Sequence, residues 1–357
     1  MNAKKFNFKR IASAVLSTAL IASMAVGMTG CSGKSEENAG TEEQPIEILN
    51  VSYDPTRELY EKYNPMFEAH YKEETGKVVK VTNSHGGSGG QANSVIEGSN
   101  QADVVTLALA NDIAKIEKEG MINEGWINEF DKQSSPYTST IDFLVRKGNP
   151  KKIKDWDDLA KEGIGVITPD PSTSGGAMWN FLAAWYYGEK EFNGDTDKIK
   201  DFVTKIYANV LVMDSGARGS TQTFVDNGQG DVLIAWENEA IATLDEHPDE
   251  YEIVSPSISI LAQPSVAIVD EIADKNGTQE VAKAYLEYLY SDEAQKVIAE
   301  SGYRPSNPDI LKEYSDKFDD IEMIDIEHFG GWAAAYDEYF ADGAIFSQIM
   351  DTVNSAK

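Results

Sequence analysis

The stretch from Asn83 to Gly98, NSHGGSGGQANSVIEG, sets Ser88 between two pairs of glycines directly after an apolar run. Glycine lets a backbone approach a ligand closely, serine offers a hydroxyl group, and histidine can take up a proton near neutral pH. Three kinds of site use such a loop: a phosphate loop, the nucleophile elbow of a serine hydrolase, and an anion-binding turn built from backbone N–H groups.

Three other segments have a similar composition: PDPSTSGGAMW, DSGARGSTQTF and YDPTREL. Each follows a predicted strand and leads into a predicted helix. In open α/β sheets, ligands bind beyond the carboxyl ends of the strands. There the first N–H groups of a helix have no internal partner, and the helix dipole contributes roughly half a positive charge. One such loop alone is typical of an ordinary cap and turn, but four in one chain favour an anion site made of neutral donors.

Two residues in these regions have a second interpretation. Asp54, followed by Pro55, predicts a helix N-cap with proline at the first helical position. Trp236 ends the apolar run DVLIAW and is either a core aromatic residue or a donor aimed into the site, because an indole donates one hydrogen bond and accepts none.

The hydrolase alternative rests on Gly86, Ser88 and Gly90, which fit the pattern G-x-S-x-G between a strand and a helix. Neither of the two candidate histidines, His247 and His328, has an evident acidic partner beyond a strand, so the sequence does not favour a catalytic triad. The phosphate-loop pattern G-x-x-x-x-G-K-[ST] is missing. The four histidines, His85 among them, are scattered, so we expect no metal site and no cofactor. A triad would take its other members from Asp170 or Asp214 and from His247 or His328.

Composition and the first residues limit the compartment and the partners. The 357 residues carry a net charge of −29 and show no basic patch, which argues against nucleic acid as a partner. Residues 1–30 have a basic start, an apolar middle and a small-residue stop, the pattern of a signal peptide. Cys31, the only cysteine, follows and resembles the lipid-accepting cysteine of a bacterial lipoprotein. We therefore expect a protein anchored to the outer face of the cytoplasmic membrane, or a periplasmic one if Cys31 is not lipidated.

The chain after the signal predicts an α/β protein with two lobes. Residues 31–45 are polar and acidic and predict a flexible tether. From residue 46 onward, short β-branched runs alternate with longer amphipathic stretches, the pattern of a mainly parallel sheet with helices on both faces. The strands are expected at IEILNVS, KVVKVT, DVVTLA, GVIT, VLVM, DVLIAW and YEIV. Expected helices include residues 55–74, 91–97, 177–187, 198–208 and 279–290.

Two further β-rich stretches, STIDFLVRKG near Thr140 and ILAQPSVAIV near Ser265, lie almost symmetrically about the middle of this part of the chain. We interpret them as crossings between two hinged lobes that close around a ligand. Residues 46–137 would begin the first lobe and residues 138–260 would form the second. Residues 261–357 would return to the first lobe and supply the C-terminal helices. A single large sheet is the alternative.

At this point the residues carry a resemblance that runs through nearly the whole chain after the signal. It rests on LNVSYDPTRELYEKYN, SHGGSGGQ, DVVTLALA, PYTSTIDFLVRKGNPK, SGGAMWNFLAAW, DSGARGSTQTF, GDVLIAWENEA, KAYLEYLYS, YRP and FGGW. These segments resemble the prokaryotic sulfate-binding protein family, the substrate-binding subunits of sulfate/thiosulfate ABC importers. The resemblance implies a type II periplasmic-binding-protein fold, two α/β lobes joined by a two-strand hinge. It also implies a monomeric receptor that is not an enzyme and that meets the permease and ATPase subunits of an importer.

The resemblance further implies the ligand contacts. Ser174 would contribute its hydroxyl group and Trp236 its indole N–H, while Arg218 would support its loop without pairing with the ligand. Another tetrahedral oxyanion, phosphate or molybdate, is the alternative, and phosphate would become acceptable if the Asp54 carboxylate faced the ligand. A secreted serine hydrolase using Ser88 is the alternative from another class.

In the sulfate site that the resemblance implies, the backbone N–H groups that contact the ligand would come from Asp54, Ser88, Gly175, Gly176 and Ala217.

Overall fold

The computed structural model describes residues 44 to 356. The predicted signal peptide, Cys31 and nearly all of the predicted tether lie outside these residues. None of the helices in the described part of the chain combines the length and the apolar character that a membrane span requires.

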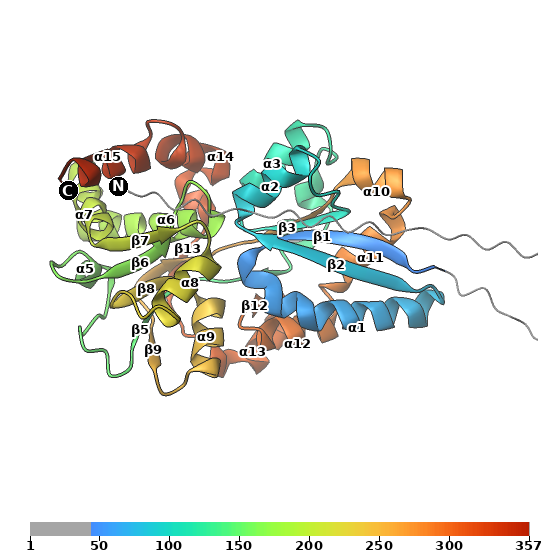
Figure 1. Cartoon of the computed structure of the whole chain (residues 1–357), viewed down its shortest axis with the longest axis horizontal. Coiled ribbons are helices and arrows are strands. Elements are labelled where there is room, and N and C mark those ends of the chain that lie inside the picture. Colours follow the sequence, from blue (N-terminus) through green and yellow to red (C-terminus); the bar gives the residue numbers. More distant parts are fainter. Residues whose placement is uncertain (1–43, 357) are drawn as a thin grey trace, which may run out of the picture. The chain divides into compact units, whose positions relative to one another are not determined.

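The first sheet has four strands in the order β11-β3-β1-β2. Figure 1 labels three of them, β1, β2 and β3. Strands β1, β2 and β3 are parallel, and β11 joins the edge antiparallel to β3. The parallel pairing brings the ends of β1 and β2 to one edge of the sheet, because Tyr53 pairs with Gly86. The strands are β1 (Ile46–Tyr53), β2 (Val79–Gly86), β3 (Val104–Leu107) and β11 (Ser265–Ile268). The helices around them are α1 (Arg57–Thr75), α2 (Ser88–Ile96), α3 (Ala110–Lys118), α10 (Asp270–Asn276), α11 (Gln279–Tyr288), α12 (Asp292–Glu300) and α13 (Pro308–Glu313).

The second sheet has five strands in the order β7-β6-β8-β5-β9. Strands β6, β7 and β8 are parallel, whereas β5 runs antiparallel to both of its neighbours. The strands are β5 (Ile141–Arg146), β6 (Val166–Pro169), β7 (Val210–Asp214), β8 (Val232–Trp236) and β9 (Tyr251–Val254). The helices are α5 (Trp156–Leu159), α6 (Gly175–Glu191), α7 (Thr196–Ala208), α8 (Ala217–Val225) and α9 (Glu237–Glu246). All seven predicted strands are present, and two sheets replace the alternative of a single large one.

Short pairings connect the two lobes. Ser139 forms an isolated antiparallel bridge with Ala262, within the two stretches that we interpreted as crossings. Strand β4 (Tyr137–Thr138) pairs antiparallel with β12 (Arg304–Pro305). Within the second lobe, strand β10 (Ile258–Ile260) pairs in parallel with β13 (Glu322–Ile324).

The end of the chain differs from the expectation that residues after 261 return to the first lobe. Strand β11 and helices α10 to α13 follow it, but α14 (Gly331–Ala335) and α15 (Ile345–Ala356) pack on the second lobe. The Trp332 ring lies edge-on to Trp179 of α6, with centroids 4.6 Å apart. Phe346 of α15 contacts Phe181, which also belongs to α6. The apolar faces of the last helices therefore cover α6.

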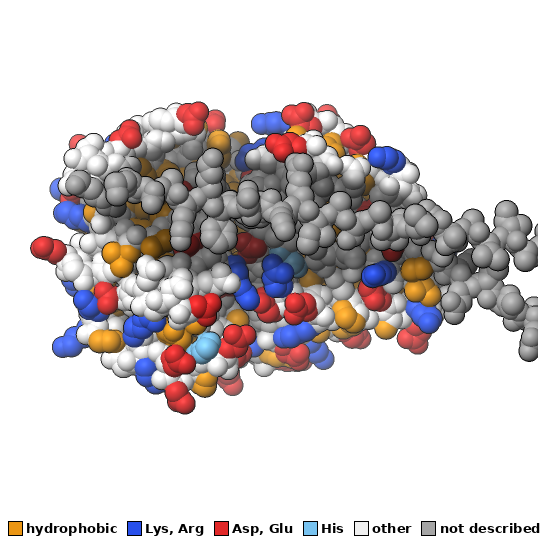
Figure 2. Space-filling model, in the orientation of Figure 1, with side chains coloured by type: hydrophobic (Ala, Val, Ile, Leu, Met, Phe, Trp, Pro, Cys, Tyr) orange, Lys and Arg blue, Asp and Glu red, His pale blue; other side chains and the backbone are white. Residues whose placement is uncertain are grey.

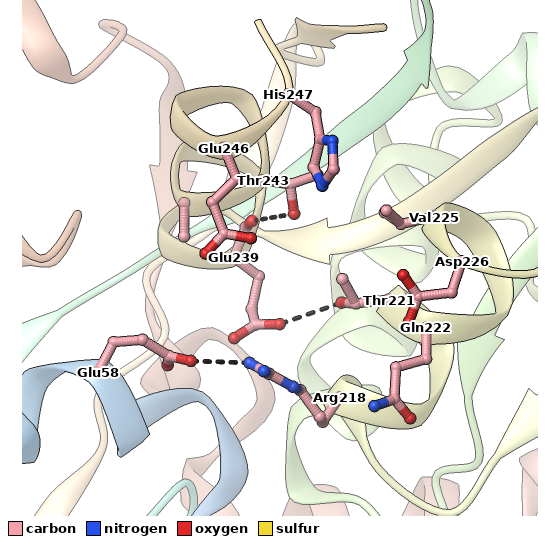
Figure 3. A pocket seen from close by; sticks show the side chains of 11 residues that line it. Glu58, Arg218, Thr221, Gln222, Val225, Asp226, Glu239, Thr243, Glu246 and His247 are labelled. Carbon is pink, nitrogen blue, oxygen red and sulfur yellow. Dashed lines mark hydrogen bonds and ion pairs between the residues drawn. The ribbon is translucent and has the colours of Figure 1, made fainter.

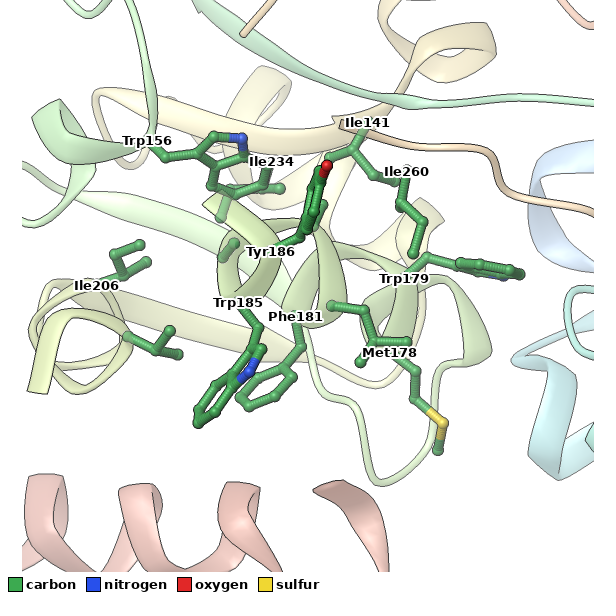
Figure 4. Close-up of a cluster of buried hydrophobic side chains, with 14 of the residues drawn as sticks. Ile141, Trp156, Met178, Trp179, Phe181, Trp185, Tyr186, Ile206, Ile234 and Ile260 are labelled. Atoms are coloured by element: carbon green, nitrogen blue, oxygen red, sulfur yellow. The ribbon is translucent and has the colours of Figure 1, made fainter. Parts of the chain in front are cut away.

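Helix α6 is a rigid support because it is apolar around its whole circumference. Its buried side chains include Met178, Trp179, Phe181 and Trp185. Figure 4 shows these side chains pointing in different directions from the helix, with residues of the second sheet such as Ile234 on one side. A helix that is apolar all round has to lie inside a core, and α6 lies between the second sheet and the C-terminal helices. Its first turn is thereby fixed relative to the second sheet.

Candidate functional site

The loops at the strand ends of both sheets enclose one small cavity of about 10 Å³. The loops after β1 and β2 approach it from the first lobe, and the loops after β6 and β7 approach it from the second. Five of the seven predicted contacts are among the residues that line it: Asp54, Ser88, Ser174, Gly176 and Ala217. The structure thus brings together positions that lie up to 163 residues apart in the chain.

The start of α6 supplies one wall of the cavity. Ser174 is the N-cap, and its side-chain oxygen accepts a hydrogen bond from the Ala177 N–H at 3.4 Å. Its hydroxyl proton is not used by this bond. Gly175 and Gly176 are the first two helical residues, whose N–H groups have no partner within the helix. A Cβ on Gly175 would lie 2.8 Å from the Leu109 side chain, so only glycine allows the two lobes to approach this closely here.

The start of α2 supplies the opposite wall. Ser88 is the first residue of α2, and it is almost fully buried. Its hydroxyl donates to Asp112 Oδ2 at 2.7 Å and accepts from the Ala108 N–H at 3.1 Å. Both sides of the hydroxyl are occupied, so what Ser88 can offer a ligand is its backbone N–H.

This arrangement excludes the hydrolase triad. The Ser88 hydroxyl donates to a carboxylate and has no histidine to accept its proton. The nearby His85 instead bonds Ser52 Oγ through Nδ1 at 2.7 Å, and burial lowers the pKa of His85 to about 4. The two histidines proposed for the triad contact other carboxylates, His247 that of Glu250 and His328 that of Glu189.

Asp54 differs in detail from the predicted N-cap. It is the first residue of a 3-10 turn, Asp54–Thr56, that leads directly into α1, and the cap position belongs to Tyr53. The cap shifts by one residue because Tyr53 keeps extended backbone angles as the last residue of β1. The Asp54 carboxylate lies against Gly216, where a Cβ would stand 2.7 Å from Asp54 Oδ2. Burial raises the pKa of Asp54, while Arg57 and Arg218 oppose that rise.

Trp236 does not itself line the cavity but contacts a residue that does. It ends β8, is 2% exposed, and its indole N–H donates to the Gly176 carbonyl at 3.2 Å. The Tyr53 ring lies beside it, with centroids 5.6 Å apart. The indole therefore contacts both walls of the site, one from each lobe.

Arg218 bridges the lobes and does not line the cavity. Ala217 is the first residue of α8, and Arg218 follows it. The Arg218 guanidinium bonds Glu58 of α1 at 2.7 Å, as the dashed line in Figure 3 shows. This pair lies in a separate pocket of about 110 Å³, where Thr221 donates to the buried carboxyl of Glu239. Burial and the nearby Glu58 raise the pKa of Glu239 to about 7.

Sequence reasoning missed backbone positions that shape the cavity. Gly87 lies where the backbones of the two lobes approach each other closely, because a Cβ there would stand 2.8 Å from the Thr173 carbonyl oxygen and 3.1 Å from that of Ser215. Ala108 lines the cavity from the end of the first sheet. The glycine-rich composition was the available signal for Gly87. Ala108 has no comparable signal, because an alanine in an apolar run looks like any core residue.

The comparison with protein families matches residues 49–304 to the family described as bacterial extracellular solute-binding protein. The chain belongs to this family. This membership makes it a binding protein that works outside the cytoplasm and not an enzyme.

The chain also matches curated relatives over nearly the whole length of those relatives, which supports its assignment to this family. The chain is 56% identical to the sulfate-binding protein of Escherichia coli K12 over 306 residues, which are 85% of this chain and 93% of the relative. It is 44% identical to the thiosulfate-binding protein of Pseudomonas aeruginosa PAO1 over 305 residues, 85% of this chain and 91% of that protein. Among solved structures, the sulfate-binding protein SubI from Mycobacterium tuberculosis H37Rv matches with a TM-score of 0.75 and 32% identity. That match covers 83% of this chain and 99% of SubI. The predicted fold, two α/β lobes of the type II periplasmic-binding-protein class, is confirmed.

Proposed function

We propose that this protein captures sulfate or thiosulfate between its two lobes and delivers the anion to the permease and ATPase subunits of an ABC importer. The observation that carries the proposal is the cavity between the strand ends, where helix starts from both lobes converge. Among the described residues that line this cavity there is no lysine or arginine. The names and the high identity of the curated relatives support the choice of anion.

Seven donors would hold the anion without a neutralising cation. Ser174 would donate its hydroxyl group and Trp236 its indole N–H. A hydrogen bond to a charged group contributes roughly 1.5 to 3 kcal/mol, so seven converging donors suffice after ordering and desolvation costs. The backbone N–H groups would come from Asp54, Ser88, Gly175, Gly176 and Ala217.

Trp236 would change its acceptor when the anion binds. Its N–H donates to the Gly176 carbonyl at 3.2 Å, and Gly176 is itself a lining residue of the cavity. A small rotation of the indole would transfer this bond to an anion oxygen. The tilted Tyr53 ring beside the indole limits how far the indole can move.

The donor inventory favours an unprotonated anion. Sulfate carries no proton at neutral pH, whereas phosphate keeps at least one and needs an acceptor for it. A buried proton without an acceptor costs about 1 to 3 kcal/mol. Among the described residues that line the cavity, Asp54 alone carries a carboxylate, and its position against Gly216 directs it to the backbone of the second lobe.

The placement outside the cell membrane would be completed by a lipid on Cys31. The tether of residues 31–45 would then give the two-lobed body reach toward the permease. We propose that the protein acts as a monomer, because one chain supplies both walls of the cavity.

Calorimetric titration of the purified protein, dialysed to remove bound ligand, tests the proposal. Sulfate, thiosulfate, phosphate and molybdate are added separately at pH 6 and pH 8. Tight binding of sulfate or thiosulfate at both pH values, without heat from phosphate, is the expected result. Phosphate binding would instead assign an acceptor role to Asp54, and silence from every anion would overturn the proposal.

A further inference from the structure

The segment Gly302–Tyr303–Arg304 lies where the two lobes meet and contacts strand ends of both. It follows α12 of the first lobe and enters β12, which pairs with β4 next to the crossing. Gly302 adopts a φ of +82°, and a Cβ there would stand 3.1 Å from the Asn238 Cα of α9. The backbone of the first lobe therefore touches the backbone of the second at this point. The YRP motif of the sequence lies in this segment.

Arg304 bonds the second lobe directly behind the proposed anion donor. Its Nε and Nη2 atoms each lie 2.7 Å from one carboxylate oxygen of Glu237, the residue that follows Trp236. Nη2 also donates to the Asp319 carbonyl at 2.7 Å. Of the ion pairs among the described residues, this one alone has both side chains no more than 11% exposed, at 11% and 3%.

Tyr303 contacts the first-lobe side of the same site. Its ring is buried against Tyr137, with centroids 4.6 Å apart, and its hydroxyl accepts a hydrogen bond from the Tyr53 hydroxyl at 3.5 Å. Tyr53 directly precedes Asp54, and its ring lies beside Trp236. Two neighbouring residues of one segment thus contact the residues flanking two proposed ligand contacts, one in each lobe.

We infer that Arg304 is a positioning residue, which holds Trp236 at the anion site through its two-point bond to Glu237 while Tyr303 supports Tyr53 from the same segment. This inference rests on the proposed function. A guanidinium fixes both oxygens of a carboxylate in one plane, which a lysine ammonium cannot do. The backbone at Glu237, and with it the end of β8, is thereby held relative to the first lobe.

A double substitution distinguishes a positioning role of Arg304 from a purely structural one. If Arg304 acts through Trp236, its effect on anion affinity should disappear once the indole N–H has been removed. If the buried ion pair only stabilises the fold, its loss should affect affinity equally with or without the indole.

The experiment is a double-mutant cycle in the full chain, with sulfate affinity measured by calorimetry for the unmodified protein, Arg304→Lys, Trp236→Phe and the double variant. We expect Arg304→Lys to weaken sulfate binding by about tenfold in the unmodified protein and by less than about twofold when Trp236 is phenylalanine. Equal losses in both backgrounds would overturn the inference. If the unmodified protein itself fails to bind sulfate, the proposed function is wrong. That outcome is distinct from equal losses in both backgrounds, which would overturn only the role of Arg304.

Arg146→Lys is the matched control. The Arg146 guanidinium donates to the carbonyl groups of Phe224, Gln229 and Gly230, in the second lobe and away from the cavity. This substitution should lower the melting temperature and leave sulfate affinity unchanged. Should Arg304→Lys not fold, Glu237→Gln replaces it in the same cycle, since it keeps the shape of the side chain and removes its charge. The same two outcomes then decide the inference.

Discussion

The proposed anion site would depend on single N–H groups more than on side chains, and Ala217 allows one of them to be removed cleanly. Ala217 is the first residue of α8, where proline is well tolerated because the N–H at this position has no helical partner. The preceding Gly216 has extended angles, φ −162° and ψ 168°, which a following proline accepts.

Ala217→Pro should therefore keep the helix and delete one donor. We expect sulfate affinity to fall by about tenfold to a hundredfold, the loss of one hydrogen bond to a charged group. Calorimetry measures the affinity and thermal unfolding shows whether the fold persists. Ala217→Ser is the control, and it should bind like the unmodified protein. Unchanged binding by the proline variant would remove Ala217 from the site.

Asp142 makes the stability of the protein depend on pH. It is buried in β5 with one carboxyl oxygen that has no hydrogen-bond partner, and burial together with the nearby Glu237 raises its pKa to about 7. The pKa of an unfolded aspartate is about 3.9. Because the folded pKa is the higher one, this group favours the folded state most below about pH 4, and that contribution is lost as the pH rises to about 7.

Asp142→Asn should remove this dependence. Compared with the unmodified protein, the variant should gain melting temperature between pH 5 and pH 8, since asparagine cannot ionise. Thermal unfolding at several pH values checks this. Parallel pH profiles for the two proteins would show that Asp142 does not change protonation in this range.

At the scale of the elements, Ser174 links the stability of α6 to binding. Its side-chain oxygen caps the helix, and its hydroxyl proton is the proposed donor to the anion. Ser174→Ala should lower the free energy of unfolding by about 1 kcal/mol and also weaken sulfate binding. Ser291, the N-cap of α12 in the first lobe, is the matched control.

Ser291→Ala should lose similar stability and bind sulfate normally. Chemical unfolding and calorimetry on both variants separate the two effects. If both variants bind equally well, the Ser174 hydroxyl is only a cap.

The elements were largely predictable because their signals are local. Short β-branched runs predicted the strands, and glycine-rich turns before apolar helices predicted the loops that form the cavity. The packing of α14 and α15 was not predictable in this way, since an apolar helix face such as that around Phe346 fits the helices of either lobe equally well. Contacts between distant residues, such as Arg304 with Glu237, leave no pattern in a single sequence.

At the scale of the whole molecule, the two lobes are joined by an ion pair at the surface of the cleft. Arg218 of α8 and Glu58 of α1 are bonded at 2.7 Å with side-chain exposures of 46% and 40%. In this exposed setting the pair contributes only about 0.2 to 1 kcal/mol. It favours the closed arrangement of the lobes without determining it.

Glu58→Gln should therefore weaken sulfate binding by less than about fivefold and mainly speed the release of the anion. Stopped-flow measurements of release at low and high salt provide the test, because salt should reduce the difference between variant and unmodified protein. Glu287→Gln is the control, since its partner Lys283 lies on the same helix. An equal release rate for Glu58→Gln and this control would mean that the ion pair does not hold the lobes together.

The surface charge of the molecule has little to do with the anion it would hold. Acidic and basic side chains are interspersed on the face that Figure 2 shows, while the sequence as a whole carries a charge of −29. The field of the protein repels an anion at long range. In the proposed site, specific capture would therefore depend on short-range donors where the two lobes meet.

A cavity lined by helix starts also affects which mutations the site can tolerate during evolution. Every amino acid except proline carries a backbone N–H, so most point mutations at a position such as Ala217 leave the donor in place. What selection has to preserve is the path of the main chain, through residues such as Gly87 and Gly175 where no side chain fits. A binding site of this kind can keep its ligand while much of the surrounding sequence drifts.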